Sequence, residues 1–133
     1  MTKTPTPKPT DAELTLLSVL WRRGPSTVRE IHDSLSENTT GYTTTLKTLQ
    51  KMTEKGLVRR DESLRSHIYR AAVAAEQTQR QLMRDLLRRA FGGSPANLVM
   101  QALSTEPATP EELAEIRSVL DDLEAKSRKE RKR

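Results

Sequence analysis

The chain has 133 residues, the length of one domain or of one small domain with an appendage, which excludes a large enzyme. Its 23 Lys and Arg exceed its 18 Asp and Glu, giving a formal net charge of +5. This balance favours a polyanionic partner such as nucleic acid, with a merely solvated basic surface as the alternative. The absence of cysteine excludes disulfides and Cys-ligated metals, and no stretch approaches the roughly 18 apolar residues of a membrane span. We expect a cytoplasmic protein with no cofactor, no metal and no membrane partner.

The two ends of the chain differ from its middle in composition. Residues 1–9 alternate Pro with Thr and Lys and predict a flexible N-terminal arm, because proline prevents a helix from starting. Residues 126–133 contain no apolar side chain and predict a frayed basic tail. Whether this tail adds non-specific affinity for a polyanion is a question that the sequence leaves open.

Two capping boxes predict the first two helices. Thr10 and Glu13 start a helix over 11–22, because the hydroxyl accepts from the third backbone amide while the carboxylate reaches back. Thr27 and Glu30 start a second, shorter helix in the same way. In the first helix, Leu14, Leu17 and Trp21, with Leu20 beside them, recur at helical spacing and predict one buried stripe.

A third helix is predicted over 42–55, after a polar run at 36–41 and before Gly56, which supplies a left-handed cap. A helical wheel places the apolar side at Tyr42, Leu46, Leu49 and Thr53. The opposite arc carries hydroxyl and amine donors, namely Thr43, Thr44, Lys47, Thr48, Lys51 and Lys55. Lysines can meet phosphates, and threonines can meet phosphates or base edges, so this side suits a helix in the major groove. We expect these six residues, together with Tyr42 at the start of the helix, to bind DNA. An isolated helix with these residues would more often be an ordinary surface helix.

Two short runs of β-forming residues at 57–60 and 66–70, separated by a charged turn, predict a two-stranded hairpin. Three short helices followed by a basic hairpin are the layout of a winged helix-turn-helix, here over residues 10–74. Arg65 and His67 lie near the predicted hairpin tip, where an arginine can reach a phosphate or the minor groove. Taken alone, His67 is more typical of a satisfied strand histidine.

Residues 75–125 predict three further helices, over 75–91, 95–103 and from 110 onward. The fold class is therefore mainly α with a small β-hairpin, a winged helix followed by a helical dimerisation region. These helices cannot enclose a core alone, so pairing of two copies is favoured over packing back onto the winged helix. The residues expected at this dimer interface are Leu82, Met83, Leu86, Leu87, Phe91, Leu113, Ile116, Leu120 and Leu123.

A specific order of motifs runs through the N-terminal part of the chain. The motifs are Thr10-Asp11-Ala12-Glu13, Leu20-Trp21, Gly24-Pro25, Thr27-Val28-Arg29-Glu30-Ile31, Tyr42-Thr43-Thr44-Thr45-Leu46-Lys47-Thr48-Leu49-Gln50-Lys51-Met52, Lys55-Gly56-Leu57-Val58 and Ile68-Tyr69. In this combination the chain resembles the BlaI/MecI/CopY family of bacterial repressors, over about residues 10–125. The resemblance implies a homodimer with a winged-helix DNA-binding domain and interlocking C-terminal helices. Two recognition helices related by a twofold axis would read an inverted repeat in double-stranded DNA, with half-sites about 34 Å apart or slightly more.

The sequence departs from this family at the sites of induction. Members that control β-lactam resistance are typically cut by a membrane sensor protease at an Asn-Phe bond, where this chain has Gln101 and Ala102. Copper-responsive members use a cysteine-rich site, which this chain cannot form. The inducing signal, an unidentified sensor or protease as a further partner, the operator sequence and the target genes stay open.

Three function classes other than a repressor are alternatives for this sequence. A winged-helix adaptor would use the same basic face to bind an acidic protein without specific DNA binding. A MarR-like ligand-responsive regulator would dimerise through helices at both ends, and no helix is predicted before residue 10. An enzyme is disfavoured because His32 and His67 are the only histidines and no metal, dinucleotide or phosphate-loop motif is present.

Overall fold

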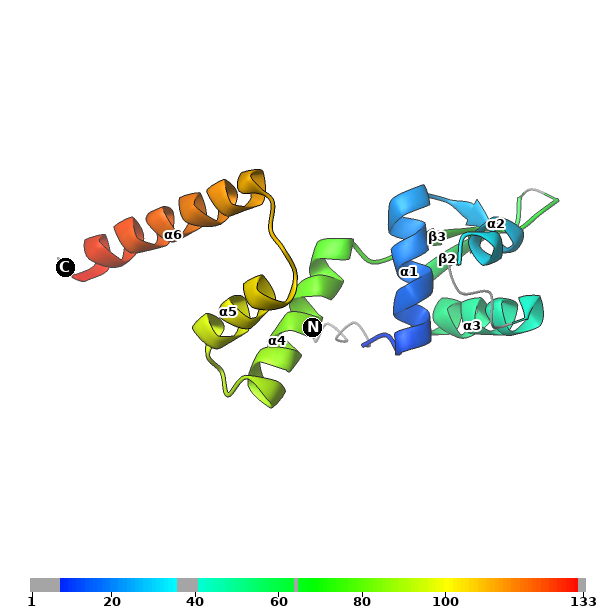
Figure 1. The fold of residues 1–133 in the computed structure, drawn as a ribbon. Helices are drawn as coiled ribbons and strands as arrows, with labels where there is room; N and C mark the ends of the chain where they lie inside the picture. The colour runs from blue at the N-terminus through cyan, green and yellow to red at the C-terminus, as the bar shows by residue number, and fades with distance from the viewer. Residues whose placement is uncertain (1–7, 36–40, 64, 132–133) are drawn as a thin grey trace. The chain divides into compact units, whose positions relative to one another are not determined.

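The computed structural model of the chain describes residues 8–35, 41–63 and 65–131 (Figure 1). Residues 1–7 of the predicted arm and residues 36–40 of the predicted polar run lie outside the described residues. In chain order the elements are α1 Asp11–Arg23, β1 Ser26–Thr27, α2 Val28–Asp33, α3 Tyr42–Lys55, β2 Val58–Asp61, β3 Ile68–Ala71, α4 Ala75–Ala90, α5 Pro95–Thr105 and α6 Pro110–Arg131. Helices with a small antiparallel sheet confirm the predicted fold class.

The chain divides into two compact units, Met1–Asp85 and Leu86–Arg133. The division falls inside α4 and not at the start of this helix, where the sequence predicted the winged helix to end. The first part of α4 joins the N-terminal unit, because its Thr78 is buried and its Asp85 forms an ion pair with Lys8. The last residues of the predicted arm are thus held in place.

The first helix packs on more than one side. Its neighbours are α2, α3 and β3, so Leu16 and Val19 are buried together with the predicted Leu17 and Leu20. Trp21, expected on the buried stripe, is half-buried and its indole N–H donates to a backbone carbonyl at 3.0 Å. Contacts on several sides widen the buried face beyond the single stripe that a helical wheel shows.

Local signals in the sequence set the ends of the three helices of the winged helix. Both predicted capping boxes are present, at Thr10 with Glu13 and at Thr27 with Glu30. Gly56 ends α3 at φ 82°, in the left-handed region where a residue with a Cβ is strained. The predicted bounds of α3 are confirmed.

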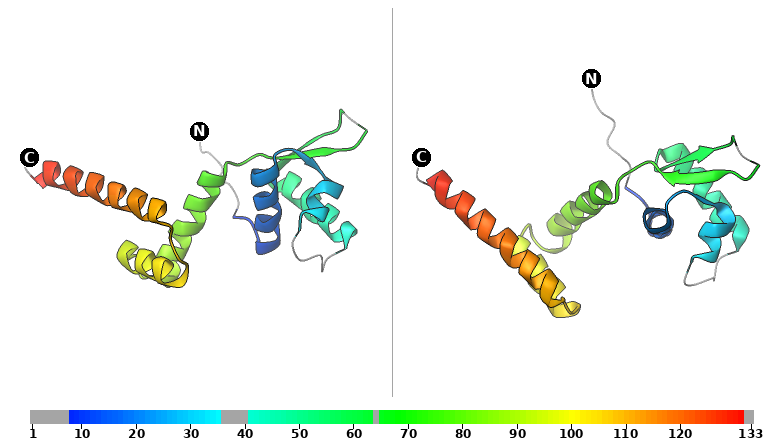
Figure 2. Two further views of the ribbon diagram at one scale, coloured as in Figure 1. Left: turned by 45° about the horizontal axis from the view of Figure 1, so that its top comes forward. Right: turned by 90° about the horizontal axis from the view of Figure 1, so that it is seen from above.

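The sheet has three strands in the order β1, β3, β2, all antiparallel. The predicted hairpin is β2 and β3, with strand bounds shifted by one or two residues, and Figure 2 shows the two strands side by side. The third strand, β1, was not predicted because two residues are too few for an alternating pattern. Val58 and Tyr69 face the helices and are buried in the core.

The C-terminal unit is built from exposed helices. Neither α5 nor α6 has a buried residue. The sequence predicted a frayed tail from residue 126, whereas α6 continues to Arg131. Lys, Arg and Glu are strong helix formers, and the cations favour the C-terminal end of the helix dipole. Arg128 also pairs with Glu124 one turn earlier, at 3.8 Å.

Candidate nucleic-acid interface

The helix α3 separates a buried side from a donor side. Thr45, Leu49 and Met52 are buried. Tyr42, predicted on the apolar side, is 38% exposed, because the buried side is centred on Thr45 and Met52. Besides Lys55, four of the predicted donors are exposed on the other side of the helix: Thr43, Thr44, Lys47 and Lys51. The structure therefore brings these four side chains together on one accessible surface.

Thr48 lies at the margin of this surface and is half-buried. Its hydroxyl donates to the backbone carbonyl of Thr44 at 2.9 Å, a common bond for threonine within a helix. In this conformation the hydroxyl proton is already used. Thr48 can then meet a groove edge only through its methyl group or as a hydrogen-bond acceptor.

Lys55, the last predicted donor on α3, has a buried partner. Its Nζ lies 2.8 Å from Oε1 of Glu13, whose side chain is 3% exposed and also accepts from the Thr10 backbone N–H. Burial alone would raise the pKa of Glu13, but the bonds from Lys55 and Thr10 outweigh it and hold this pKa below its ordinary value of 4.5. Lys55 therefore joins the end of α3 to the start of α1, a contact that a wheel of one helix cannot reveal.

The first turn of α3 is tied to α2 by two sets of contacts. The Nδ1 of His32 lies 3.0 Å from the hydroxyl oxygen of Thr45, and the His32 ring meets the Tyr42 ring edge-on with centroids 5.8 Å apart. The guanidinium of Arg29 lies over the same Tyr42 ring, 4.7 Å from its centre. His32 is buried. Neither Arg29 nor Thr45 was singled out from the sequence.

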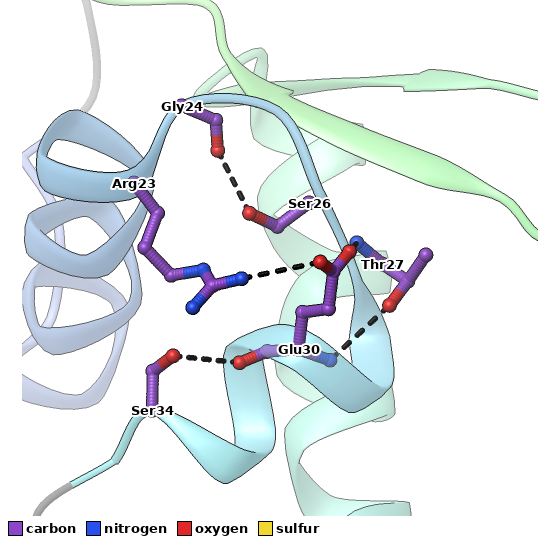
Figure 3. A network of polar contacts seen from close by, with 6 residues as sticks. All are labelled: Arg23, Gly24, Ser26, Thr27, Glu30 and Ser34. Atoms are coloured by element: carbon purple, nitrogen blue, oxygen red, sulfur yellow. Dashed lines mark hydrogen bonds and ion pairs between the residues drawn. The ribbon is translucent and has the colours of Figure 1, made fainter.

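The position of α2 is set by polar contacts at its start (Figure 3). Glu30 accepts from the Thr27 backbone N–H at 2.9 Å and pairs with Arg23 of α1 at 3.1 Å. The bonds from Thr27, assisted by Arg23, lower the pKa of Glu30 below its ordinary value. The Ser34 hydroxyl donates to the Glu30 carbonyl at 2.7 Å. The capping box that starts α2 therefore also links it to α1.

The outward face of the hairpin carries two arginines in register. Arg59 on β2 and Arg70 on β3 are direct antiparallel partners, and both are exposed. Like charges directly opposite each other repel, so an anion bound here would relieve the repulsion. Hydrogen bonds from Ser63, with a smaller contribution from Arg70, hold the pKa of Asp61 below its ordinary value.

The connection between β2 and β3 carries the predicted tip residues. Arg65 and His67 are both exposed there. Arg60, at the end of β2, forms an ion pair with Glu62, and its pKa is raised by the Tyr69 hydroxyl and by Glu62. The structure thus presents Arg65 and His67 to solvent, while Arg60 has an acidic neighbour.

The predicted dimer residues lie on helices with little internal cover. Leu82, Leu87, Phe91, Leu113 and Ile116 are half-buried. Met83 is 45%, Leu86 50%, Leu120 52% and Leu123 57% exposed. Four further exposed apolar side chains were not among the predicted residues: Val99, Met100, Leu103 and Val119. Three of them lie on α5, which the predicted interface did not use, and Val119 lies on α6 outside its predicted apolar stripe.

Other kinds of site find no support in the part of the chain that the structure describes. Over residues 8–35, 41–63 and 65–131, no three His, Asp or Glu side chains gather as a metal site would require. No helix within the same ranges is both long and apolar enough to cross a membrane.

Comparison with known proteins agrees with the resemblance. The family model described as penicillinase repressor matches residues 9–122. The transcriptional regulator BlaI of Mycobacterium tuberculosis is 33% identical over 119 residues, covering 86% of this chain and 84% of that protein. The penicillinase repressor of Bacillus licheniformis is 25% identical over 117 residues, covering 87% and 91%.

Among solved structures, the chain is similar to the transcriptional regulator BldR from Sulfolobus solfataricus. The identity is 20% and the TM-score is 0.40, with 83% of this chain and 74% of that chain covered. A similarity at this level adds nothing to the fold assignment, which rests on the family match and on the helices and sheet described above. Since the family match spans most of its length, this chain belongs to the penicillinase repressor family.

Proposed function

We propose that this chain is a transcriptional repressor that binds an inverted repeat in double-stranded DNA as a homodimer. The observation that carries the proposal is the accessible donor side of α3, which lies opposite its buried side. A helix of this kind, third in a winged helix-turn-helix, is the element that enters the major groove. The names of the two relatives, a transcriptional regulator and a penicillinase repressor, support this function.

The donors on α3 divide into two roles. Lys47 and Lys51 neutralise phosphates, which supplies affinity without sequence preference. Thr43 and Thr44 contact base edges through their hydroxyl and methyl groups, with Thr48 acting through its methyl or as an acceptor. In the wing, Arg65 and His67 reach the backbone or the minor groove beside the half-site. Lys55 has no part in this proposal because Glu13 engages it.

Dimerisation accounts for the apolar side chains of the C-terminal helices. Met83, Leu86, Leu120 and Leu123 are each about half exposed within one copy. A second copy would cover them, since a large exposed apolar patch is typical of an interaction surface. A twofold axis through these helices then pairs two copies of α3 with two half-sites about one helical turn, ~34 Å, apart.

The experiment that tests the function is selection of bound sequences from a random duplex pool. The winning sequence is compared with scrambled DNA at two salt concentrations. We expect an inverted repeat and a large ratio of specific to non-specific affinity, which survives at the higher salt. Recovery of no motif, together with binding that vanishes at physiological salt, would contradict the proposal and favour an adaptor with an acidic protein partner.

A paired variant assigns the recognition role to α3. Replacing Thr43 and Thr44 by valine keeps their shape but removes both hydroxyls, so discrimination should fall by about tenfold or more, with little change on scrambled DNA. The matched control is Thr15→Val, an exposed threonine on α1. Equal losses in the two proteins would remove these threonines from the recognition surface.

A further inference from the structure

One charged side chain outside the predicted DNA-binding set lies against the start of the recognition helix. Arg29 belongs to α2, is exposed, and holds its guanidinium 4.7 Å from the centre of the Tyr42 ring. Tyr42 is the first residue of α3, directly before Thr43 and Thr44. The stacked pair therefore stands beside the two threonines proposed to contact base edges.

The stack restricts the orientation of an otherwise mobile side chain. A guanidinium is planar, prefers to lie on an aromatic face, and carries five N–H donors around its edge. When one face of the plane rests on a ring, the donors at the edge stay available for a phosphate. The Tyr42 ring is itself held, because His32 contacts it edge-on and binds Thr45 one turn further along α3.

Contacts to α2 take the place of a side-chain cap at the start of α3. Its N-cap residue is Gly41, which has no side chain that could accept a hydrogen bond from the first turn. The first turn is positioned instead by Tyr42 and Thr45, which meet Arg29 and His32 of α2. The first helix of a helix-turn-helix crosses the DNA backbone while the second enters the groove. A cation on α2 that points toward the start of α3 is therefore well placed to meet a phosphate.

We propose that Arg29, held on the ring of Tyr42, binds a DNA phosphate beside each half-site and thereby fixes the depth and angle of the first turn of α3. This inference rests on the proposed function. It changes the role of Tyr42, which presents the arginine with its ring and need not contact the DNA itself. It also adds one phosphate contact per subunit to those made by Lys47 and Lys51.

The test measures affinity for the selected operator over a range of salt concentrations. Arg29→Ala should lower affinity by about tenfold at 0.1 M salt and flatten the salt slope by about one unit per subunit, because one phosphate contact per subunit is lost. Arg29→Lys should keep most of the slope but not the full affinity, since lysine has the charge without the planar face. In a Tyr42→Phe background, which keeps the ring, Arg29→Ala should cost as much affinity as it does in the wild type.

A double-mutant cycle separates the stack from a free cation. In a Tyr42→Leu background, Arg29→Ala should cost less than half, on a logarithmic scale, of what it costs in the wild type. Arg22→Ala, an exposed arginine at the end of α1, is the matched control and should change neither affinity nor slope. Circular dichroism and thermal unfolding verify that each variant is folded. If Tyr42→Leu does not fold, Arg29→Lys and Tyr42→Phe test the same contact.

Two results would overturn the inference. One is an Arg29→Ala protein that binds as the Arg22→Ala control does, and the other is an equal cost of Arg29→Ala with and without the Tyr42 ring. Failure of the proposed function is a distinct outcome, because the wild-type protein itself would then select no operator.

Discussion

The two units of this chain differ in how far they bury their apolar side chains. In the N-terminal unit, residues from all three helices and from the sheet are buried, among them Leu17, Ile31, Leu49 and Tyr69 at 0% exposure. In the C-terminal unit, α5 and α6 bury no residue, and Leu120 and Leu123 are more than half exposed. The first unit, called the closed unit below, completes its own core. The second, called the open unit, leaves apolar side chains exposed to solvent.

This difference separates the residues that maintain the fold from those available for association. A side chain already buried in one copy contributes little free energy to binding a second copy. An exposed leucine contributes favourable free energy for each part of its surface that the second copy removes from water. The donor side of α3 lies on the closed unit. The proposed dimer surface lies mostly on the open unit, since only Leu82 and Met83 precede its first residue, Leu86. The following predictions test this division, beginning with the largest effect.

The same substitution should destabilise the closed unit strongly and the open unit hardly at all. Leu17→Ala leaves a cavity in a closed core and should lower the free energy of unfolding by about 2–5 kcal/mol. Leu123→Ala removes a side chain that is 57% exposed, and should change the free energy of unfolding of the isolated chain by about 0.5 kcal/mol or less. Denaturant unfolding at low protein concentration measures both. Similar losses in the two variants would contradict the division.

A charge on the open unit should act on association and not on folding. Leu120→Asp places a carboxylate where the proposed dimer needs an apolar contact, and should raise the dissociation constant of the dimer by about thirtyfold or more. Asp121→Asn, a change at the neighbouring exposed position, is the control. Sedimentation over a concentration series gives the constants. A Leu120→Asp protein that associates as the wild type does would exclude this surface from the interface.

The ion pair between α1 and α3 should make the stability of the closed unit depend on pH. The pKa of Glu13 is lower in the folded chain than its ordinary value of 4.5, so its contribution is fully present above that value. The contribution is lost as pH falls through the folded pKa. We expect Glu13→Gln to cost about 1–2 kcal/mol at pH 7, since Lys55 is partly exposed and screened.

Thermal unfolding from pH 7 to pH 3 measures this effect for the wild type and for Glu13→Gln. The difference between the two proteins should shrink below pH 4.5. Glu54→Gln, an exposed glutamate on α3, is the control and should show no such trend. A constant difference over the whole range would show that the carboxylate charge does not stabilise the fold.

The smallest predicted effect concerns a single phosphate contact. Lys51→Ala should weaken binding to operator and scrambled DNA alike and flatten the salt slope by about one unit per subunit. Gln50→Ala, at the adjacent exposed position, is the control. An unchanged slope would remove Lys51 from the phosphate-binding set, and a loss confined to the operator would indicate that it reads bases instead.

Much of the closed unit follows from local signals in the sequence. Two capping boxes and Gly56 place the ends of helices, because each satisfies backbone groups within a few residues of itself. The exposed donors Thr43, Thr44, Lys47 and Lys51 follow from the period of α3 alone. These features depend on short stretches of chain, and for that reason sequence reasoning recovered them.

Contacts between elements were beyond the reach of such reasoning. The strand β1 exists because Ser26 and Thr27 find a partner in β3, about 40 residues later. The extension of α6 past residue 125 was missed because the absence of apolar residues suggested disorder, while helix propensity and end charges favour a helix.

The sequence by itself determined the helices, the hairpin and the donor side of α3, because these depend on periodicity and on local caps. The tertiary structure decided which partners the charged side chains have. It committed Lys55 to the buried Glu13 and placed Arg29 on the ring of Tyr42. Both outcomes arise where two elements meet in space, and the pairing of charge with charge, or of charge with ring, acts over a few ångströms whatever the distance along the chain.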